Sequence, residues 1–156
     1  MKIDVERITG EIRNMSPLIH CITNPISITQ CANAVLCLGA KPIMAEHPKE
    51  VLEITGTSDA LLLNLGNITD IRIKAMTISA NAAKEQNIPI ILDAVGVACS
   101  ALRRNFAIGL IQSTNPDVIK GNYSEIYALY NEKYKSGGVD ADLSLDRAFM
   151  SGVSVE

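Results

Sequence analysis

The chain has 156 residues, of which 47% are hydrophobic and 20% charged, and this length favours one globular domain with a buried core. A net charge of −3 with two phenylalanines and no tryptophan gives little attraction to nucleic acid and few rings on which bases could stack. The apolar runs are too short to cross a bilayer, and residues 1–15 lack the apolar core of a secretory signal. We therefore expect a cytoplasmic protein that binds neither nucleic acid nor membranes.

Short apolar runs alternate with segments of helical length, a pattern that predicts an α/β fold with a mostly parallel sheet flanked by helices. The runs in "ALLLNLG" and "PIILDAVG" predict strands that are buried on both faces. In chain order we expect a helix over Val5–Met15, a strand over Leu18–Ile22, a helix over Ser27–Leu38, a strand over Pro42–Met44, a helix over Lys49–Ile54, a strand over Ala60–Asn64, a helix over Asp70–Gln86, a strand over Ile88–Val95, a helix over Ala101–Ile111, a strand over Val118–Lys120 and a helix over Ser124–Tyr130.

Local signals support these boundaries. Thr69 or Asp70 can cap the long helix, and Gly39 can end the helix before it. The periodic pattern weakens after Asn131, where two adjacent glycines occur. We therefore expect one α/β domain over residues 1–140 and a poorly ordered tail over residues 141–156.

The cysteines at positions 21, 31, 37 and 99 form no C-x-x-C pair and lie among apolar neighbours. A zinc site at His20 and Cys21 would need further ligands at short spacing, but the other histidine, His47, lies in a different segment. We expect small buried thiols without disulfides, and we interpret His20 and Cys21 as strand residues.

Polar residues gather where the expected strands end, and ligands of parallel α/β sheets bind at that edge. Asp93 has two interpretations, a cation or proton site and an ordinary turn aspartate. Lys120 also stands at a strand end, and Glu125 lies one turn into the next helix, where an ordinary helix cap would explain it. Together, two carboxylates that can hold hydrated Mg²⁺ and one lysine that can offset phosphate charge favour phosphoryl chemistry. Neither the P-loop nor the dinucleotide-binding fingerprint occurs in the sequence.

Four ordered segments, "HCITNPISITQCANAVLCLGAKPIMA", "LLLNLGNIT", "PIILDAVGVACS" and "DVIKGNYSEIYAL", closely resemble the hydroxyethylthiazole kinase family over about residues 5–140. The resemblance implies a ribokinase-like fold and transfer of phosphate from Mg·ATP to the alcohol of 4-methyl-5-(2-hydroxyethyl)thiazole in thiamine salvage. It also implies a homotrimer with active sites between subunits.

The resemblance assigns roles residue by residue. Met44 and Asn24 correspond to positions that contact or line the thiazole pocket. Lys120 falls where the family has an ATP-contacting cation, and Asn122 of the same "IKGN" segment is expected on the ATP side. Asp93 and Glu125 match acidic positions associated with magnesium and phosphate.

Two departures from the family pattern bear on function. The family's "LDPVGAG" is "LDAVGVA" here, so the loop loses a proline and a glycine. The glycine-rich "TGTGC" anion hole, where the family's catalytic residue lies, is not found in these 156 residues. We therefore expect a ribokinase-like fold that is truncated at the C-terminus, resembles the N-terminal part of the family and has little kinase activity alone. The alternatives are a non-catalytic thiazole-binding or assembly module and, less well supported, another sugar or vitamin kinase of the same fold.

Overall fold

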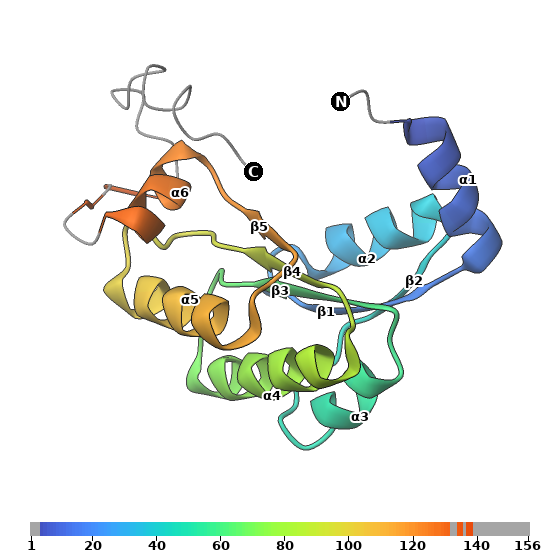
Figure 1. Ribbon diagram of the computed structural model, residues 1–156, viewed down its shortest axis with the longest axis horizontal. Coiled ribbons are helices and arrows are strands. Elements are labelled where there is room, and N and C mark those ends of the chain that lie inside the picture. Colours follow the sequence, from blue (N-terminus) through green and yellow to red (C-terminus); the bar gives the residue numbers. More distant parts are fainter. Residues whose placement is uncertain (1–3, 132–133, 136, 139–156) are drawn as a thin grey trace.

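The computed structural model describes residues 4–131, 134–135 and 137–138, and within them the expected alternation of helices and strands is present (Figure 1). The strands are β1 (Leu18–Ile22), β2 (Lys41–Ile43), β3 (Ala60–Asn64), β4 (Ile90–Asp93) and β5 (Val118–Lys120). The helices are α1 (Val5–Met15), α2 (Ile28–Leu38), α3 (Val51–Gly56), α4 (Asp70–Gln86), α5 (Ala101–Thr114) and α6 (Tyr123–Tyr130). The expected tail over residues 141–156, and the boundary before it, lie outside the described residues.

The strands form one sheet in the order β2-β1-β3-β4-β5, and the neighbouring strands are parallel. The predicted α/β fold with a parallel sheet is therefore confirmed. Because all five strands run the same way, their carboxyl ends meet at one edge of the sheet. Residues that follow different strands in the sequence are brought side by side there.

Several predicted boundaries need correction. The strand expected over residues 88–95 is shorter and spans Ile90–Asp93, since the Ile88 N–H still donates to the Ala83 carbonyl at 2.8 Å at the end of α4. Asn87, in the left-handed conformation with φ 57°, ends that helix. After Asp93 the chain turns, and Gly96 adopts φ 79°. Thr69 and Gly39 cap α4 and α2 as expected.

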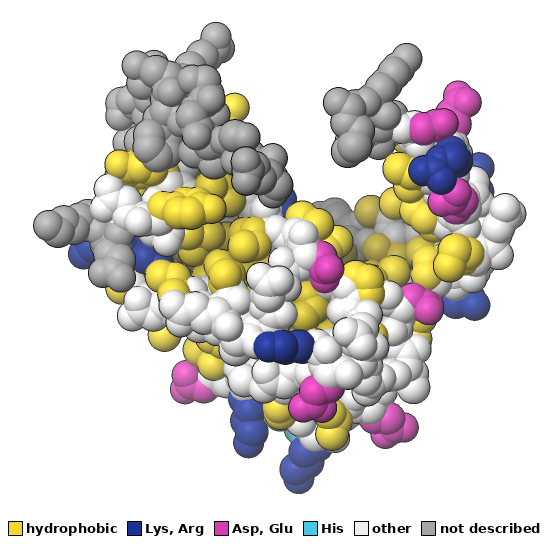
Figure 2. Space-filling view, viewed as in Figure 1, with side chains coloured by type: hydrophobic (Ala, Val, Ile, Leu, Met, Phe, Trp, Pro, Cys, Tyr) yellow, Lys and Arg dark blue, Asp and Glu magenta, His cyan; other side chains and the backbone are white. Residues whose placement is uncertain are grey.

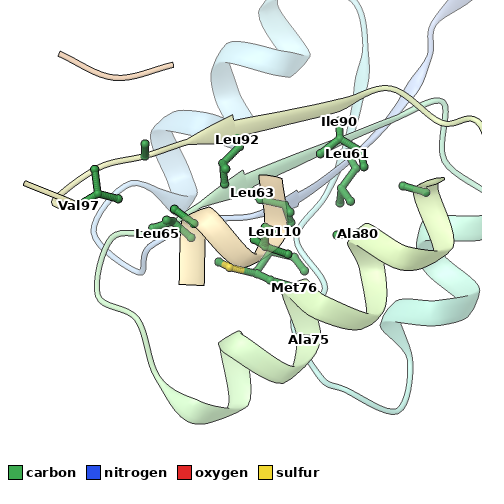
Figure 3. Close-up of a cluster of buried hydrophobic side chains, with 14 of the residues drawn as sticks. Leu61, Leu63, Leu65, Ala75, Met76, Ala80, Ile90, Leu92, Val97 and Leu110 are labelled. Atoms are coloured by element: carbon green, nitrogen blue, oxygen red, sulfur yellow. The ribbon is translucent and has the colours of Figure 1, made fainter. Parts of the chain in front are cut away.

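The main core lies between the sheet and the helices on one side of it. In Figure 1, α3, α4 and α5 lie below the strands, whereas α1 and α2 lie above them. The side chains of Leu61, Leu63 and Leu92 meet Met76 of α4 and Leu110 of α5 in this core (Figure 3). The upper helices differ, because neither α1 nor α2 contains a buried residue. The described helices thus cover the two faces of the sheet very unequally.

The cysteine prediction is correct in part. All four thiols are free, and Cys21 is buried, but Cys37 and Cys99 are exposed. Cys37 lies in the last turn of α2, a helix that contains no buried residue, and Cys99 lies in the loop before α5. Burial raises the pKa of the Cys21 thiol to about 12, with smaller contributions from Cys31, so Cys21 stays protonated at neutral pH and is a poor nucleophile. Among the described residues, no helix is long and apolar enough to cross a membrane.

Candidate functional site

Four side chains form a hydrogen-bonded row across the carboxyl edge of the sheet. The Asn24 amide nitrogen donates to Asn64 Oδ1 at 3.2 Å, and the Asn64 amide nitrogen donates to Asp93 Oδ2 at 2.9 Å. Lys120 Nζ then donates to Asp93 Oδ2 at 3.2 Å. Because the row runs from the end of β1 through β3 and β4 to β5, it joins a predicted thiazole contact to a predicted ATP contact.

Strand register accounts for this row. Asn64 pairs with Asp93, and Asp93 pairs with Lys120, so the three side chains stand on the same face of the sheet. The orientation of the Asn64 amide is fixed by its partners, since its Oδ1 also accepts from the Gly66 N–H at 2.9 Å. Gly66 itself is needed here, because a Cβ would lie 2.9 Å from both Asn24 Nδ2 and Asn64 Oδ1.

The charged end of the row is accessible to a ligand. The Lys120 side chain is 65% exposed, whereas the Asp93 side chain is 17% exposed. An ion pair with one such exposed partner is weak in water, so the ammonium group can turn from the carboxylate toward a bound phosphate at little cost. Asp93 is held more firmly, since it also accepts from the Asn64 amide.

Glu125 has a different environment from Asp93. Its Oε1 accepts from the Gly96 N–H at 2.8 Å and its Oε2 from the Asn122 N–H at 2.8 Å, and the residue is 3% exposed. The Asn122 side chain accepts from the Glu125 N–H in return, which completes a capping box at the start of α6. Glu125 therefore ties the loop after β4 to the first turn of α6.

A backbone hydrogen bond to β5 holds the start of the loop after β4. Ala94, which stands where the family has proline, donates its N–H to the Lys120 carbonyl at 2.8 Å. A proline has no N–H and could not make this bond. Ala94, Val97 and Ala98 are all buried, so the residues that depart from the family pattern contribute to the core.

Met44 follows β2 and is partly buried. A hydrogen bond from His20 holds the next residue, Ala45, in place. His20 Nε2 lies 2.9 Å from the Ala45 carbonyl, and Nδ1 lies 2.9 Å from the Thr55 hydroxyl. Because a carbonyl can only accept, Nε2 carries the proton and Nδ1 accepts from Thr55. Burial lowers the pKa of His20 from its ordinary 6.5, although the Ala45 hydrogen bond and Glu50 oppose this. Neutral His20 thus anchors the loop that carries Met44, a role that sequence reasoning did not assign to it.

Arg72 is a second residue that sequence reasoning missed. It is buried in the first turn of α4 and donates to the carbonyls of Asn64 (2.9 Å), Asn67 (2.9 Å) and Gly66. Its Nε lies 3.6 Å from Glu46 Oε2. Burial lowers the pKa of Arg72, with Glu46 acting in the opposite direction. The signal available in the sequence was a cation in a helical first turn, where the helix dipole favours anions.

Few of the described side chains at this edge of the sheet could hold magnesium. Within the part of the chain that the structure describes, no group of three or more His, Cys, Asp and Glu residues could hold a metal ion. Mg²⁺ is, however, commonly bound by one or two carboxylates together with water and substrate phosphates. Asp93 fits that pattern at the edge of the sheet. Glu125 would have to share oxygens that already accept backbone N–H groups, and its metal role stays a prediction.

The chain matches the hydroxyethylthiazole kinase family over residues 9–151. It is 53% identical over 134 residues to hydroxyethylthiazole kinase 1 of Clostridium botulinum, which covers 86% of this chain and 51% of that protein. It is 47% identical over 137 residues to hydroxyethylthiazole kinase of Finegoldia magna, covering 88% of this chain and 51% of that protein.

A solved structure shows the same arrangement. The hydroxyethylthiazole kinase protein of Pyrococcus horikoshii superposes with a TM-score of 0.78 and 35% identity over 81% of this chain and 49% of that one. The chain therefore spans about half the length of the curated and solved relatives that it matches.

Proposed function

This chain belongs to the hydroxyethylthiazole kinase family, and we propose that it forms the part of a kinase that brings a thiazole alcohol and Mg·ATP together. The reaction is transfer of the γ-phosphoryl group of ATP to the hydroxyl of 4-methyl-5-(2-hydroxyethyl)thiazole, in thiamine salvage. The observation that carries the proposal is the row from Asn24 through Asn64 and Asp93 to Lys120. It supplies neutral amides at one end and a mobile cation at the other, on one rigid edge.

The two ends of the row have separate tasks in this proposal. Asn24 and Met44 line the thiazole pocket, and His20 and Thr55 hold the loop that carries Met44 in place. Lys120 and Asn122 face the ATP phosphates. The Lys120 ammonium group moves away from Asp93 and offsets the phosphate charge. Strands that fix both ends at once favour an in-line approach of the alcohol, because the reactants lose little further freedom on reacting.

Asp93 and Glu125 are the proposed contacts for magnesium. When bound, Mg²⁺ supplies charge neutralisation at the phosphate oxygens. Asn64 keeps the Asp93 carboxylate oriented by donating to Oδ2, whereas the hydrogen bonds of Glu125 order the loop at Gly96. We assign no catalytic residue in this chain, because the resemblance puts it in the glycine-rich segment that the sequence does not contain.

Equilibrium binding tests the proposal directly. Isothermal titration of the purified chain with the thiazole alcohol and, separately, with Mg·ATP is expected to show binding of both. Lys120→Met should weaken Mg·ATP binding and leave thiazole binding unchanged. The matched control is Lys41→Met, since Lys41 is an exposed strand lysine that begins β2 at the opposite edge of the sheet. Failure of the unmodified chain to bind either ligand would contradict the proposal.

A coupled assay of ADP formation separates the kinase from its alternative. We expect slow thiazole-dependent turnover by the chain alone. Thiazole binding without any ADP formation would favour the non-catalytic binding module. The proposed homotrimer is measured by sedimentation equilibrium, and exposed apolar side chains on α1 and α2, such as Met15 and Leu36, support such an association.

A further inference from the structure

Arg72 is a buried cation that contacts two of the loops at the carboxyl edge of the sheet. The lysine and arginine side chains visible in Figure 2 project from the surface, whereas Arg72 is 3% exposed. An arginine is rarely buried unless its charge and its N–H groups find partners. The partners of Arg72 therefore indicate why this residue is buried.

The first of the two loops follows β3 and lies beside Asn24 of the proposed thiazole pocket. The Arg72 guanidinium group donates to three backbone carbonyls of this loop, those of Asn64, Gly66 and Asn67. Gly66 lies directly against Asn24, since a Cβ on Gly66 would be 2.9 Å from Asn24 Nδ2. A planar guanidinium group that binds several carbonyls of one turn fixes the path of that turn. Arg72 thus fixes the backbone against which Asn24 packs.

The second loop follows β2 and carries Met44 and Glu46. Arg72 Nε lies 3.6 Å from Glu46 Oε2, and this buried N–H has no hydrogen-bond acceptor among the described residues. A buried N–H without an acceptor is costly, so the guanidinium group attracts the Glu46 carboxylate both by its charge and by its free donor. His20 holds Ala45 of the same loop. Met44 is therefore followed by two anchored residues.

The place of Arg72 in α4 explains how one side chain reaches both loops. The residue lies in the first turn of a 17-residue helix, and its own N–H donates to the N-cap residue Thr69. The guanidinium group is therefore carried by a rigid element that packs against β3 and β4. A cation in the first turn opposes the helix dipole. The contacts with the two loops have to offset that cost.

From these observations we propose that Arg72 is a positioning residue, which fixes the distance between the loop of Met44 and the turn at Gly66 on the two sides of the thiazole pocket. It acts through Glu46 and the backbone carbonyls and does not touch the thiazole alcohol. The inference rests on the proposed thiazole pocket. It predicts that a change at Arg72 weakens thiazole binding and spares the end of the site that faces ATP.

Titration calorimetry of the full purified chain compares Arg72→Lys with Arg104→Lys. Lysine keeps the charge but cannot donate to several carbonyls from one plane, so Arg72→Lys should raise the Kd of the thiazole alcohol about tenfold and that of Mg·ATP less than about twofold. Arg104 is the matched control, because it is also buried and donates to backbone carbonyls, including those of Val97 and Ala98 before α5. Arg104→Lys should lower the stability similarly and leave thiazole binding unchanged.

Glu46→Gln tests the second contact without disturbing the core, since the Glu46 side chain is 48% exposed. The amide keeps the shape of the side chain and loses its charge, so the Kd of the thiazole alcohol should rise about threefold. If both residues act through one contact, the double variant should bind the thiazole about as weakly as Arg72→Lys alone. Effects that simply add would overturn the coupling. Glu46→Gln also keeps the test valid if Arg72→Lys fails to fold.

Hydrogen exchange of the Gly66 amide, followed by NMR, gives a readout that needs no ligand. This buried N–H donates to Asn64 Oδ1. Its exchange should be about threefold faster or more in Arg72→Lys and in Glu46→Gln, and unchanged in Arg104→Lys, because only the first two substitutions loosen the turn. If the unmodified chain binds no thiazole alcohol, the proposed function fails, and the exchange rates alone decide whether Arg72 positions the two loops.

The outcomes separate positioning from a merely structural role. Weaker thiazole binding with unchanged Mg·ATP binding and faster Gly66 exchange supports the proposal. Three results would overturn it. These are equal changes of the thiazole Kd in Arg72→Lys and Arg104→Lys, equal weakening of both ligands in Arg72→Lys, and Gly66 exchange that neither Arg72→Lys nor Glu46→Gln alters.

Discussion

Asn64 is the residue on which the candidate site depends most directly. It accepts hydrogen bonds from Asn24 and Gly66 and donates to Asp93, so one planar amide links the ends of β1, β3 and β4. Asparagine suits this position because its amide both donates and accepts. A carboxylate there could not donate to Asp93 and would add a like charge beside it.

Replacing Asn64 with leucine tests this role. Asn64→Leu removes the donor to Asp93 and the acceptor for Asn24, and we expect the free energy of unfolding to fall by about 1–3 kcal/mol because partly buried polar groups lose their partners. Urea unfolding followed by circular dichroism measures the change. Asn33→Leu, at an exposed position of α2, should change the stability by no more than about 0.5 kcal/mol. Equal effects of the two substitutions would contradict the proposed link.

The burial of His20 predicts that the free energy of unfolding depends on pH. Burial holds the pKa of folded His20 below its ordinary 6.5, so below that pH the unfolded chain takes up a proton that the folded chain does not. The free energy of unfolding should therefore decrease as the pH falls through this range. Urea unfolding at about pH 7.5 and about pH 5.5 measures the difference, which should shrink in His20→Gln. The exposed His47 provides the control, and a decrease that His47→Gln removes as well would contradict the assignment to His20.

The sequence predicted which residues lie at the site better than it predicted the hydrogen bonds between them. Asn24, Asp93 and Lys120 were identifiable because they lie at the carboxyl ends of predicted parallel strands, where ligands bind, and because they match positions of the family. Their sequence positions did not predict the hydrogen-bonded row, because the row depends on β1 lying beside β3, which only the folded sheet specifies. Arg72 was missed for a related reason, since a buried arginine is recognised only from the carbonyls that surround it.

At the scale of elements, the loop after β4 and the start of α6 behave as one unit. Glu125 supplies both connections, to Gly96 and to Asn122. Gly96 could not be replaced easily, because it has φ 79° and a Cβ would lie 2.1 Å from Arg103 Nη1. The capping box of α6 was foreseeable from the Asn122 and Glu125 spacing, whereas the bond to the Gly96 loop was not, because it spans 29 residues.

Removing the Glu125 carboxylate should therefore destabilise both the loop after β4 and the start of α6. Glu125→Ala leaves the N–H groups of Gly96 and Asn122 without their acceptor, and we expect a loss of about 2 kcal/mol or more in the free energy of unfolding. Thermal or urea unfolding measures it. Glu11→Ala is the comparison, since Glu11 forms only an exposed ion pair with Arg7 and should cost less than about 0.5 kcal/mol. Similar losses in both variants would contradict the role assigned to the buried Glu125 carboxylate.

For the molecule as a whole, the sequence was sufficient to predict the α/β class and the order of the elements. It did not reveal how unequally the two faces of the sheet are covered. Both α2 and α4 contain enough apolar residues to pack on a sheet, yet α4 buries residues such as Met76 and Ala80 whereas α2 buries none. Apolar periodicity predicts that a helix has a packing face, but what it packs against is a property of the complete fold.

This asymmetry predicts how stability is distributed along the chain. Amides of β3 and β4 should exchange most slowly with deuterium, because Leu61, Leu63 and Leu92 are fully buried and opening those strands requires exposing the main core. Amides of α1 and β5 should exchange fastest among the described elements, since α1 contains no buried residue and β5 is an exposed edge strand. Hydrogen exchange measured by mass spectrometry or NMR at constant pH gives the order directly. Protection in β5 equal to that in β3 would contradict this order, because β5 is exposed along its length whereas fully buried residues alternate along β3.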